Sequence, residues 1–328
     1  MATSISVTKT FSAASGINAI TTRLLPQIGL PILGIVAFLF IWHVAAARVQ
    51  TSLGQFPGPE HVLTQAKGLY AEYREDKARE AAFYARQEKR AADARAQDPN
   101  FVAEFRPYTG KPTFVKQIFT SLKTVFTGFL LASVIAIPVG IAIGLSSNLY
   151  MSINPLLQLF KPISPLAWLP LVTIAVSALY TTSDDGLPKS YITSSITVML
   201  CSLWPTLLNT AVGVTSVSPD LVNVSRVLRL NWFRHVRSIV LPASVPMIFT
   251  GLRLSLGTAW MVLIAAEMLA QNPGLGKFVW DEFQNGSSDS LGRIMVAVLT
   301  IGLIGYLLDR GMLALQRYVS WDKSAVFR

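Results

Sequence analysis

Six long apolar segments dominate the sequence and leave few folds open to it. A helix needs roughly 20 apolar residues to cross a bilayer core about 30 Å thick, and every segment is long enough. Lipid offers the backbone no hydrogen-bond partner, so such segments cross the membrane as helices. The sequence therefore predicts an all-α integral membrane protein with six transmembrane helices, at about residues 24–47, 119–146, 156–180, 191–213, 243–270 and 291–316.

The composition agrees with a membrane protein and argues against other classes. Of 328 residues, 52% are hydrophobic and only 14% are charged, whereas soluble domains carry about 25% charged residues. The net charge of +10 comes from cations scattered over loops beside apolar segments, which the positive-inside rule explains without nucleic acid. Three distant histidines make a zinc cluster improbable, and the single Cys201 cannot form an internal disulfide.

Loop charges predict that both termini lie in the cytoplasm, because short loops rich in lysine and arginine stay on that side. The cytoplasmic parts would be the loops near 147–155 and 214–242 and the tail after 317, with Arg317, Lys323 and Arg328. The external loops would be 48–118, 181–190 and 271–290, with Asp184, Asp185, Asp281, Glu282 and Asp289. The first segment is too long for a signal-peptide core and lacks an upstream basic cluster, so we expect it to be retained as a span.

A charged segment separates the first two apolar segments. Residues 60–98 are rich in Ala, Glu, Arg and Lys, and Glu75 and Arg79 have the i,i+4 spacing of a helical ion pair. Its charges nearly cancel and long loops translocate regardless, so we expect an external helix or helical hairpin. Two roles stay open for it: a solvated spacer, or a docking surface for an external partner.

Two patterns inside the apolar segments indicate close helix packing and a broken helix. Ala136, Gly140 and Gly144 recur every four residues, which lets helix backbones approach closely, either within the chain or between two copies. Non-helical backbone at membrane depth is tolerated only inside protein or along a water-lined cavity. The stretch 161–170 is therefore a candidate pathway wall, because the third segment is interrupted at Pro155, Pro162, Pro165 and Pro170.

Enzyme motifs are missing from the sequence. Gly276-Lys277 is followed by Phe278, and Gln271 stands where a phosphate-binding loop would place its first glycine. G-x-S-x-G, H-E-x-x-H and C-x-x-C are also absent. We therefore expect no catalytic residue, no metal site and no cofactor bound by this chain.

A few polar residues within or beside the spans are candidates for a transport pathway. Charged residues there usually face a bundle interior or an aqueous path. Glu267 follows an uncharged run, and its alternative role is a structural hydrogen-bonded carboxylate or an interface residue near the outer surface. Lys161 has snorkelling as its alternative. A small anion must be held weakly enough to leave, which favours neutral donors. The pathway candidates are Lys161, Ser164, Trp168, Thr206, Asn209, Arg253 and Glu267; helix packing is the alternative for Ser164, Trp168 and Asn209.

The loop between the fourth and fifth apolar segments is basic and ends on a short motif. The apolar residues of the loop recur with the period of a helix. We expect residues 223–237 to form one helix before Ile239-x-Leu241-Pro242. The apolar face of that helix would carry Leu221, Val224, Val227 and Leu228. The loop contains one acidic residue, Asp220, and four basic ones: Arg226, Arg229, Arg234 and Arg237.

This loop resembles the coupling loop of ABC-importer permeases, where the membrane subunit binds its ATPase. The family pattern is E-A-A, three residues, Gly, nine residues and I-x-LP; here Asn223-Val224-Ser225 and Arg229 replace E-A-A and Gly. From Ser121 to about Trp321 the chain resembles the nitrate/taurine/bicarbonate type, on the blocks FKPISPLAWLP, SLWPTLLNTAVGV and LPASVPMIFTGLRLSLGTAWMVLIAAEMLA. The first two blocks are similar to the nitrate branch in particular.

The resemblance implies a MetI-like (type I ABC importer) permease fold with a cytoplasmic coupling helix. It implies a bacterial inner-membrane assembly of two permease copies, two cytoplasmic ABC ATPase subunits that bind ATP and Mg²⁺, and a periplasmic or lipid-anchored solute-binding protein. The implied cargo is a small inorganic anion, nitrate first, with nitrite, cyanate, bicarbonate or a taurine-type sulfonate as alternatives. The implied ATPase-coupling residues are Asn223, Ser225, Arg226, Arg229, Arg234, Ile239, Leu241 and Pro242.

The predicted organisation has four parts: 1–55 with the first span, 56–118 as the external insertion, 119–318 as the transmembrane core with coupling loop 219–242, and 319–328 as a cytoplasmic tail. A secondary transporter is an alternative class, but it predicts repeated halves with broken helices in matching positions, and no convincing repeat is present. A membrane-embedded enzyme would need paired polar catalytic residues. Co-purification of an ATPase would separate the first class from these two.

Overall fold

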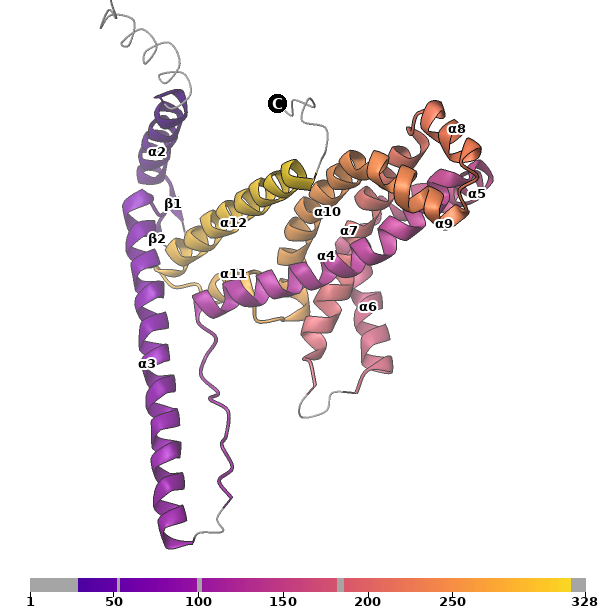
Figure 1. The fold of residues 1–328 in the computed structure, drawn as a ribbon. Helices are drawn as coiled ribbons and strands as arrows, with labels where there is room; N and C mark the ends of the chain where they lie inside the picture. The colour runs from indigo at the N-terminus through magenta and orange to yellow at the C-terminus, as the bar shows by residue number, and fades with distance from the viewer. Residues whose placement is uncertain (1–28, 52–53, 99–101, 182–185, 320–328) are drawn as a thin grey trace, which may run out of the picture. The chain divides into compact units, whose positions relative to one another are not determined.

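A computed structural model describes residues 29–51, 54–98, 102–181 and 186–319, and most of them are helical (Figure 1). The chain divides into two compact units, residues 1–64 and 65–328. Expectations for residues 24–28, for Asp184 and Asp185, and for the tail with Lys323 and Arg328 lie outside the described residues.

The first unit contains the first expected span. α2 (Leu30–Arg48) is apolar throughout, and Ala46 alone among its residues is buried, as suits a helix surrounded by lipid. β1 (Gln50–Thr51) then pairs antiparallel with β2 (Gly54–Gln55). The φ angle of Gly54 is 116°, a conformation that favours glycine. The Trp42 indole donates to the Pro57 carbonyl at 3.2 Å and ties α2 to the start of α3 (Pro59–Gln97).

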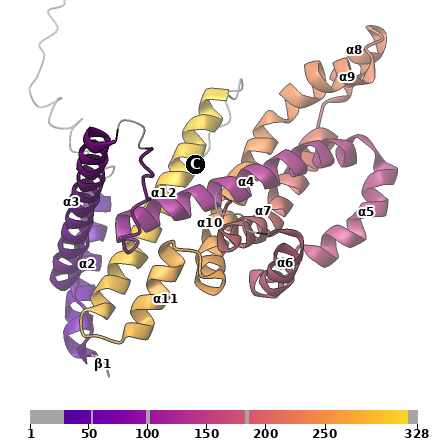
Figure 2. The same cartoon turned by 90° about the horizontal axis from the view of Figure 1, so that it is seen from below.

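Three long helices form the centre of the second unit (Figure 2). α7 (Lys189–Thr215) packs along both α4 (Phe114–Leu145) and α10 (Leu241–Ala270), and α12 (Ser290–Val319) packs on α10. The small residues of α4 face α7: a Cβ on Gly140 would lie 2.7 Å from the Leu207 carbonyl oxygen, and one on Gly144 would lie 2.8 Å from that of Ala211. The small-residue repeat therefore serves packing within the chain.

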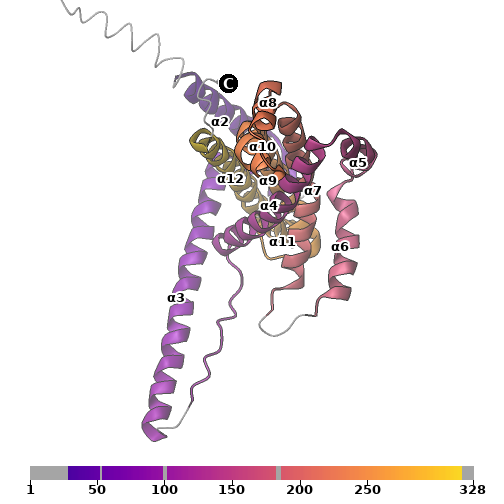
Figure 3. The same ribbon diagram turned by 45° about the vertical axis from the view of Figure 1, so that its right-hand side comes forward.

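The third apolar segment is two helices joined at a corner. α5 (Ser147–Phe160) and α6 (Pro165–Leu179) are bent by 99° across residues 161–164 (Figure 3). Pro162 and Pro165 lack N–H groups and cannot continue a helix, and the Ser164 hydroxyl caps α6 by accepting from the Leu166 N–H at 3.3 Å. The expected break is confirmed, but it makes 156–180 a broken span. The described residues therefore hold five candidate spans, or six with this bent pair.

The insertion forms one continuous helix. In α3 the Glu75–Arg79 ion pair is present at 3.4 Å, as expected. The chain after residue 102 runs back beside it, and the Gln87 amide makes two hydrogen bonds with the Arg106 backbone, at 2.9 and 2.8 Å. The C-terminal half of α3 is therefore held against the extended segment that follows.

Candidate coupling surface and transport pathway

The basic loop before α10 folds into two short helices rather than one. α8 (Pro219–Val227) and α9 (Trp232–His235) are separated by a turn, and the π-helical turn η2 (Val236–Val240) leads from α9 into α10. The expectation of one helix over 223–237 is therefore wrong. α8 stops because Arg229 adopts a left-handed conformation with φ 49°, which no α-helix can continue.

The end of α8 has the hydrogen bonds of a glycine cap without the glycine. The Arg229 N–H donates to the Arg226 carbonyl and the Leu230 N–H to the Ser225 carbonyl, both at 3.1 Å, which is the Schellman pattern. A left-handed conformation costs a non-glycine residue roughly 1–2 kcal/mol. Position 229 is where the coupling-loop pattern places its glycine, the residue that adopts this conformation at the lowest cost.

Polar side chains hold the two short helices together. The Ser225 hydroxyl, which is buried, lies 2.8 Å from His235 Nδ1. The Asn231 side chain caps α9 by accepting from the Arg234 N–H at 2.9 Å. Two of the expected coupling residues thus take part in hydrogen bonds within the loop, Ser225 through its hydroxyl and Arg234 through its backbone N–H.

The outer face of the loop is apolar and basic. Exposed large apolar groups among polar ones mark interaction sites. Asn223 is exposed here, Ile239 is partly buried in η2, and Leu241 and Pro242 start α10. Pro242 lies in the first turn, where a missing N–H is tolerated. The exposed apolar residues are Leu221, Val224, Val227, Leu228, Trp232 and Phe233, and the exposed cations are Arg226, Arg229, Arg234 and Arg237.

The α5–α6 corner offers fewer free donors than expected. The N–H groups of Lys161, Ile163, Ala167 and Trp168 all reach backbone carbonyls within the corner. Lys161 and Ser164 are exposed there. The Trp168 indole N–H is buried and has no hydrogen-bond partner among the described residues.

An aromatic cluster joins this corner to α7. The Trp168 ring stacks on Phe160 with centroids 6.1 Å apart, and Phe160 stacks on Trp204 at 6.3 Å. Trp168 also borders an apolar groove between α6 and α7. Packing and pathway roles are both compatible with this position.

Thr206 and Asn209 lie in the contact between α7 and α10. Thr206 is fully buried, and its hydroxyl and N–H donate to the Ser255 hydroxyl at 2.7 and 3.0 Å. The Asn209 amide donates to the Pro205 carbonyl at 2.8 Å, and a Cβ on Gly251 would lie 2.9 Å from the Asn209 Cβ. Asn209 is partly exposed, whereas Thr206 is enclosed by helix packing.

Glu267 is a fully buried carboxylate that joins α4, α10 and α11 (Leu275–Asn285). It accepts from the Ser121 hydroxyl at 2.7 and 2.9 Å and from the Gly276 N–H at 3.1 Å. The Leu275 N–H donates to the Ser121 hydroxyl at 2.8 Å. A carboxylate at a helix N-terminus is favourable, so Glu267 stabilises the start of α11, as a structural hydrogen-bonded carboxylate would.

Arg253 is paired across two helices. It binds Asp309 of α12 in a bidentate manner, at 2.5 and 2.9 Å, and the two side chains are 39% and 40% exposed in the single chain. Charged residues in spans face protein or water rather than lipid. This face of α10 and α12 is therefore expected to be covered by protein or water in the membrane.

The sequence does not show which residues pair with each other at these two places. Ser121 and Glu267 are 146 residues apart, and Arg253 and Asp309 are 56 apart. Its one signal is the position of Asp309 inside an apolar run, because a carboxylate there usually has a partner.

Known proteins share both the sequence and the fold. The profile of the binding-protein-dependent transport system inner membrane component matches residues 128–321. The bicarbonate transport system permease protein CmpB of Synechococcus elongatus is 34% identical over 291 residues, which cover 88% of each chain. The nitrate import permease protein NrtB of Synechocystis sp. is 40% identical over 203 residues, 62% of this chain and 69% of NrtB. A chain of the inward-facing MetNI methionine ABC transporter has a TM-score of 0.55 at 15% identity, covering 62% of this chain and 95% of that chain.

The family profile, the relatives and the shared fold together define the class of protein as a transport permease of the membrane. The chain belongs to the family of binding-protein-dependent transport system inner membrane components, and it is an ABC-importer permease with a MetI-like fold. Membership of this family implies ATPase subunits and a solute-binding protein as partners.

Proposed function

We propose that this chain is the membrane-spanning subunit of an ATP-driven importer for a small inorganic anion, nitrate or bicarbonate. The observation that carries the proposal is the exposed surface of the loop from α8 to η2, which combines six large apolar side chains with four arginines. Exposed apolar groups among polar ones mark a site of interaction. A cytoplasmic ABC ATPase subunit is the partner that family membership implies, with ATP and Mg²⁺ bound there and not by this chain.

The loop geometry suits the transmission of force. Ser225 and His235 fix α8 to α9, and η2 continues into α10 without a break. α10 has 30 residues, which corresponds to about 45 Å of helix. A displacement of the loop by the ATPase would therefore move α10 as a rod and reach the Glu267 corner at its far end, which biases a two-state bundle.

The orientation and the assembly follow from the same proposal. With α8 and α9 in the cytoplasm, both termini are cytoplasmic and α3 and α11 are external. A second permease copy, or the aqueous pathway between two copies, would cover the half-exposed Arg253–Asp309 pair, while lipid surrounds the remaining apolar faces. Ser164, Trp168 and Asn209 stay the candidates for neutral donors to the anion, supported by the unpartnered Trp168 indole N–H.

Nitrate is the first candidate cargo and bicarbonate the second. The nitrate and bicarbonate relatives are about equally similar to this chain, and nitrate is placed first because the blocks FKPISPLAWLP and SLWPTLLNTAVGV resemble the nitrate branch. The test uses the complete transporter in liposomes, with its own ATPase and solute-binding protein, and measures uptake of isotope-labelled nitrate and bicarbonate. We expect ATP-dependent nitrate uptake that nitrite or cyanate reduces and taurine does not. Uptake of bicarbonate alone would reverse the order, and a lack of ATP-dependent uptake of any of these anions would refute the proposal.

A further inference from the structure

One charged pair lies at membrane depth between α10 and α12. At 1.5 Å per residue, Arg253 lies about 18 Å along α10 from its first residue and about 25 Å from its last. Asp309 lies about 28 Å from the start of α12 and about 15 Å from its end. Charged residues inside spans face protein or water. The pair therefore marks a part of the surface that lipid does not cover.

Asp309 binds the guanidinium of Arg253 along one edge. Arg253 Nε donates to one carboxylate oxygen at 2.5 Å, and Nη2 donates to the other at 2.9 Å. Two turns further along α10, the Trp260 indole N–H donates to the Ile301 carbonyl of α12 at 3.0 Å. Both contacts join the same two helices, and the bidentate one also fixes the plane of the guanidinium.

A second edge of this guanidinium is unoccupied. A guanidinium carries five N–H groups, and Asp309 accepts from two of them. The other three, on Nη1 and Nη2, have no hydrogen-bond partner among the described residues. No nitrogen of Arg253 is buried without a partner, and its side chain is 39% exposed. The free edge therefore faces outward from the single chain.

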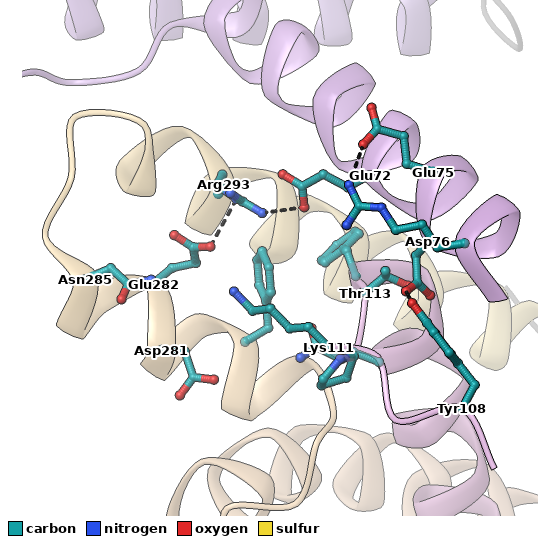
Figure 4. A pocket seen from close by; sticks show the side chains of 15 residues that line it. Glu72, Glu75, Asp76, Tyr108, Lys111, Thr113, Asp281, Glu282, Asn285 and Arg293 are labelled. Carbon is teal, nitrogen blue, oxygen red and sulfur yellow. Dashed lines mark hydrogen bonds and ion pairs between the residues drawn. The ribbon is translucent and has the colours of Figure 1, made fainter. Parts of the chain in front are cut away.

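Arg293, near the start of α12, has a different setting (Figure 4). It lies 2.8 Å from Glu72 and 3.0 Å from Glu282, so two carboxylates share one cation. An anion is disfavoured there, because the two carboxylates outweigh the cation. Arg253 is bound to a single carboxylate, which balances its charge without exceeding it.

The surface beside the free edge is open and carries a second cation. Gly257 lies one turn after Arg253 on the same face of α10, and a Cβ there would meet no other part of the chain within 4 Å. Arg310, which follows Asp309, is exposed and lies over the Tyr306 ring, 5.1 Å from its centroid. Asp309 can balance only one of the two arginines, so the net charge of this surface favours an anion.

The free edge also has the geometry that a planar oxyanion requires. A guanidinium binds a carboxylate through two parallel N–H···O bonds, and nitrate and bicarbonate are planar with oxygens arranged as in a carboxylate. An anion in a pathway must be released as well as bound. A guanidinium that is already paired with a carboxylate attracts a second anion less than a free one does. A paired arginine therefore allows weak binding, as neutral donors do.

We propose that the free Nη1–Nη2 edge of Arg253 binds the transported anion within the pathway. Asp309 is a positioning residue, which orients the guanidinium and limits its affinity. The inference rests on the proposed function, which supplies a planar monovalent oxyanion as the cargo. The surface around Gly257 is then part of the aqueous path and not a closed contact between two copies.

A cysteine beside the free edge can report its occupancy. G257C in a C201S background is reconstituted with its ATPase subunits, and its modification by anionic and cationic methanethiosulfonates is timed. We expect modification to be about twofold or more slower in nitrate than in chloride of equal ionic strength, because nitrate occupies the fork. R253K keeps the charge without the planar fork, so about fivefold or more nitrate should be needed for the same protection. R310K is the matched control and should leave the protection unchanged.

D309N gives a second readout, which a purely structural ion pair would not change. It keeps the shape of the carboxylate and removes its charge. We expect about threefold or more lower nitrate concentrations to protect G257C, because the charge of Arg253 is no longer balanced. The maximal rate of nitrate uptake should fall, since an anion that is held more tightly leaves more slowly.

The outcomes separate this inference from the function on which it rests. Lack of modification of G257C in every nucleotide state would show that the surface is covered, and it would overturn the site. Modification without protection by nitrate or bicarbonate would overturn it too, as would equal losses of protection in R253K and R310K. ATP-dependent uptake by the C201S transporter would leave the importer intact in each case. Absence of uptake would refute the proposed function and the cargo of this site together. Size-exclusion chromatography confirms that each variant assembles.

Discussion

At the scale of single residues, Arg229 combines two properties that substitution can separate. Its backbone is left-handed, and its side chain contributes charge to the coupling face. R229G removes the backbone penalty of roughly 1–2 kcal/mol, whereas R229E keeps the penalty and reverses the charge. We expect R229G to retain substrate-stimulated ATP hydrolysis and to slow amide exchange at Ser225–His235. R229E should lower the stimulated rate several-fold without affecting membrane insertion.

ATP hydrolysis in liposomes and hydrogen exchange in detergent provide the two measurements. Full coupling in R229E would contradict contact between this arginine and the ATPase. Faster exchange in R229G than in the wild type would contradict the strain at position 229.

Glu267 and Ser121 should behave as one unit in stability measurements. E267A leaves the Ser121 hydroxyl and the Gly276 N–H without their acceptor, which costs about 1–3 kcal/mol or more. We expect S121A to be less harmful and the double variant to be better than the sum of the two, because residues in one hydrogen-bond network are coupled. The measurement is thermal unfolding of the purified permease. T258A is the control, since that exposed hydroxyl bonds only within α10, and strict additivity would contradict the network.

At the scale of elements, the sequence predicts which segments are helical but not how they meet. The spans follow from apolar length, because lipid forces every backbone group into an internal hydrogen bond. Prolines predict the break near Lys161, yet the 99° bend depends on how α6 packs against α7. The split of the coupling loop was not predicted, because periodicity continues past Leu228 and only the φ angle of Arg229 ends α8.

One of the contacts that attach α3 to the core is made by Asp76, which is buried and bonded to Lys116 and Tyr108. The hydrogen bond from Lys116 is the largest cause that lowers the pKa of Asp76 below its ordinary value. A lowered carboxyl pKa contributes stability above the ordinary value of about 3.9 and loses it as pH falls through the folded-state pKa. We therefore expect the attachment to be independent of pH between about 5 and 8 and to weaken only in stronger acid.

D76N should loosen the attachment at neutral pH. The loss of a hydrogen bond to a charged group costs about 1–2 kcal/mol, which corresponds to roughly tenfold faster amide exchange over residues 65–80. Hydrogen exchange of the purified permease at several pH values measures both effects, and D93N on the exposed part of α3 is the control. Unchanged exchange in D76N would show that the remaining contacts hold α3 without this carboxylate.

At the scale of the whole molecule, the basic loop with α8 and α9 lies at one end of α10 and the Glu267 corner lies at the other. The basic and apolar composition of the loop can be predicted from sequence, because its arginines and apolar residues are adjacent in the chain. The Glu267 corner cannot, since Ser121 and Glu267 are 146 residues apart. The transport pathway is the hardest part to predict from the sequence. If two copies form the transporter, residues of both chains line its central cavity, and one chain alone does not show which residues meet there.

The pathway itself can be tested by chemical access in the assembled transporter. Ser164 and Asn209 are accessible to different degrees, and Trp168 presents an unpartnered indole N–H. Single cysteines at the three positions, in a C201S background, should react with a small water-soluble thiol reagent at rates that change when nucleotide is trapped. A cysteine at the fully buried Ser202 should not react, and one at the exposed Ala92 should react from the external side in every state. Protection of all three positions in every nucleotide state, together with wild-type transport by S164A and N209A, would assign them to helix packing.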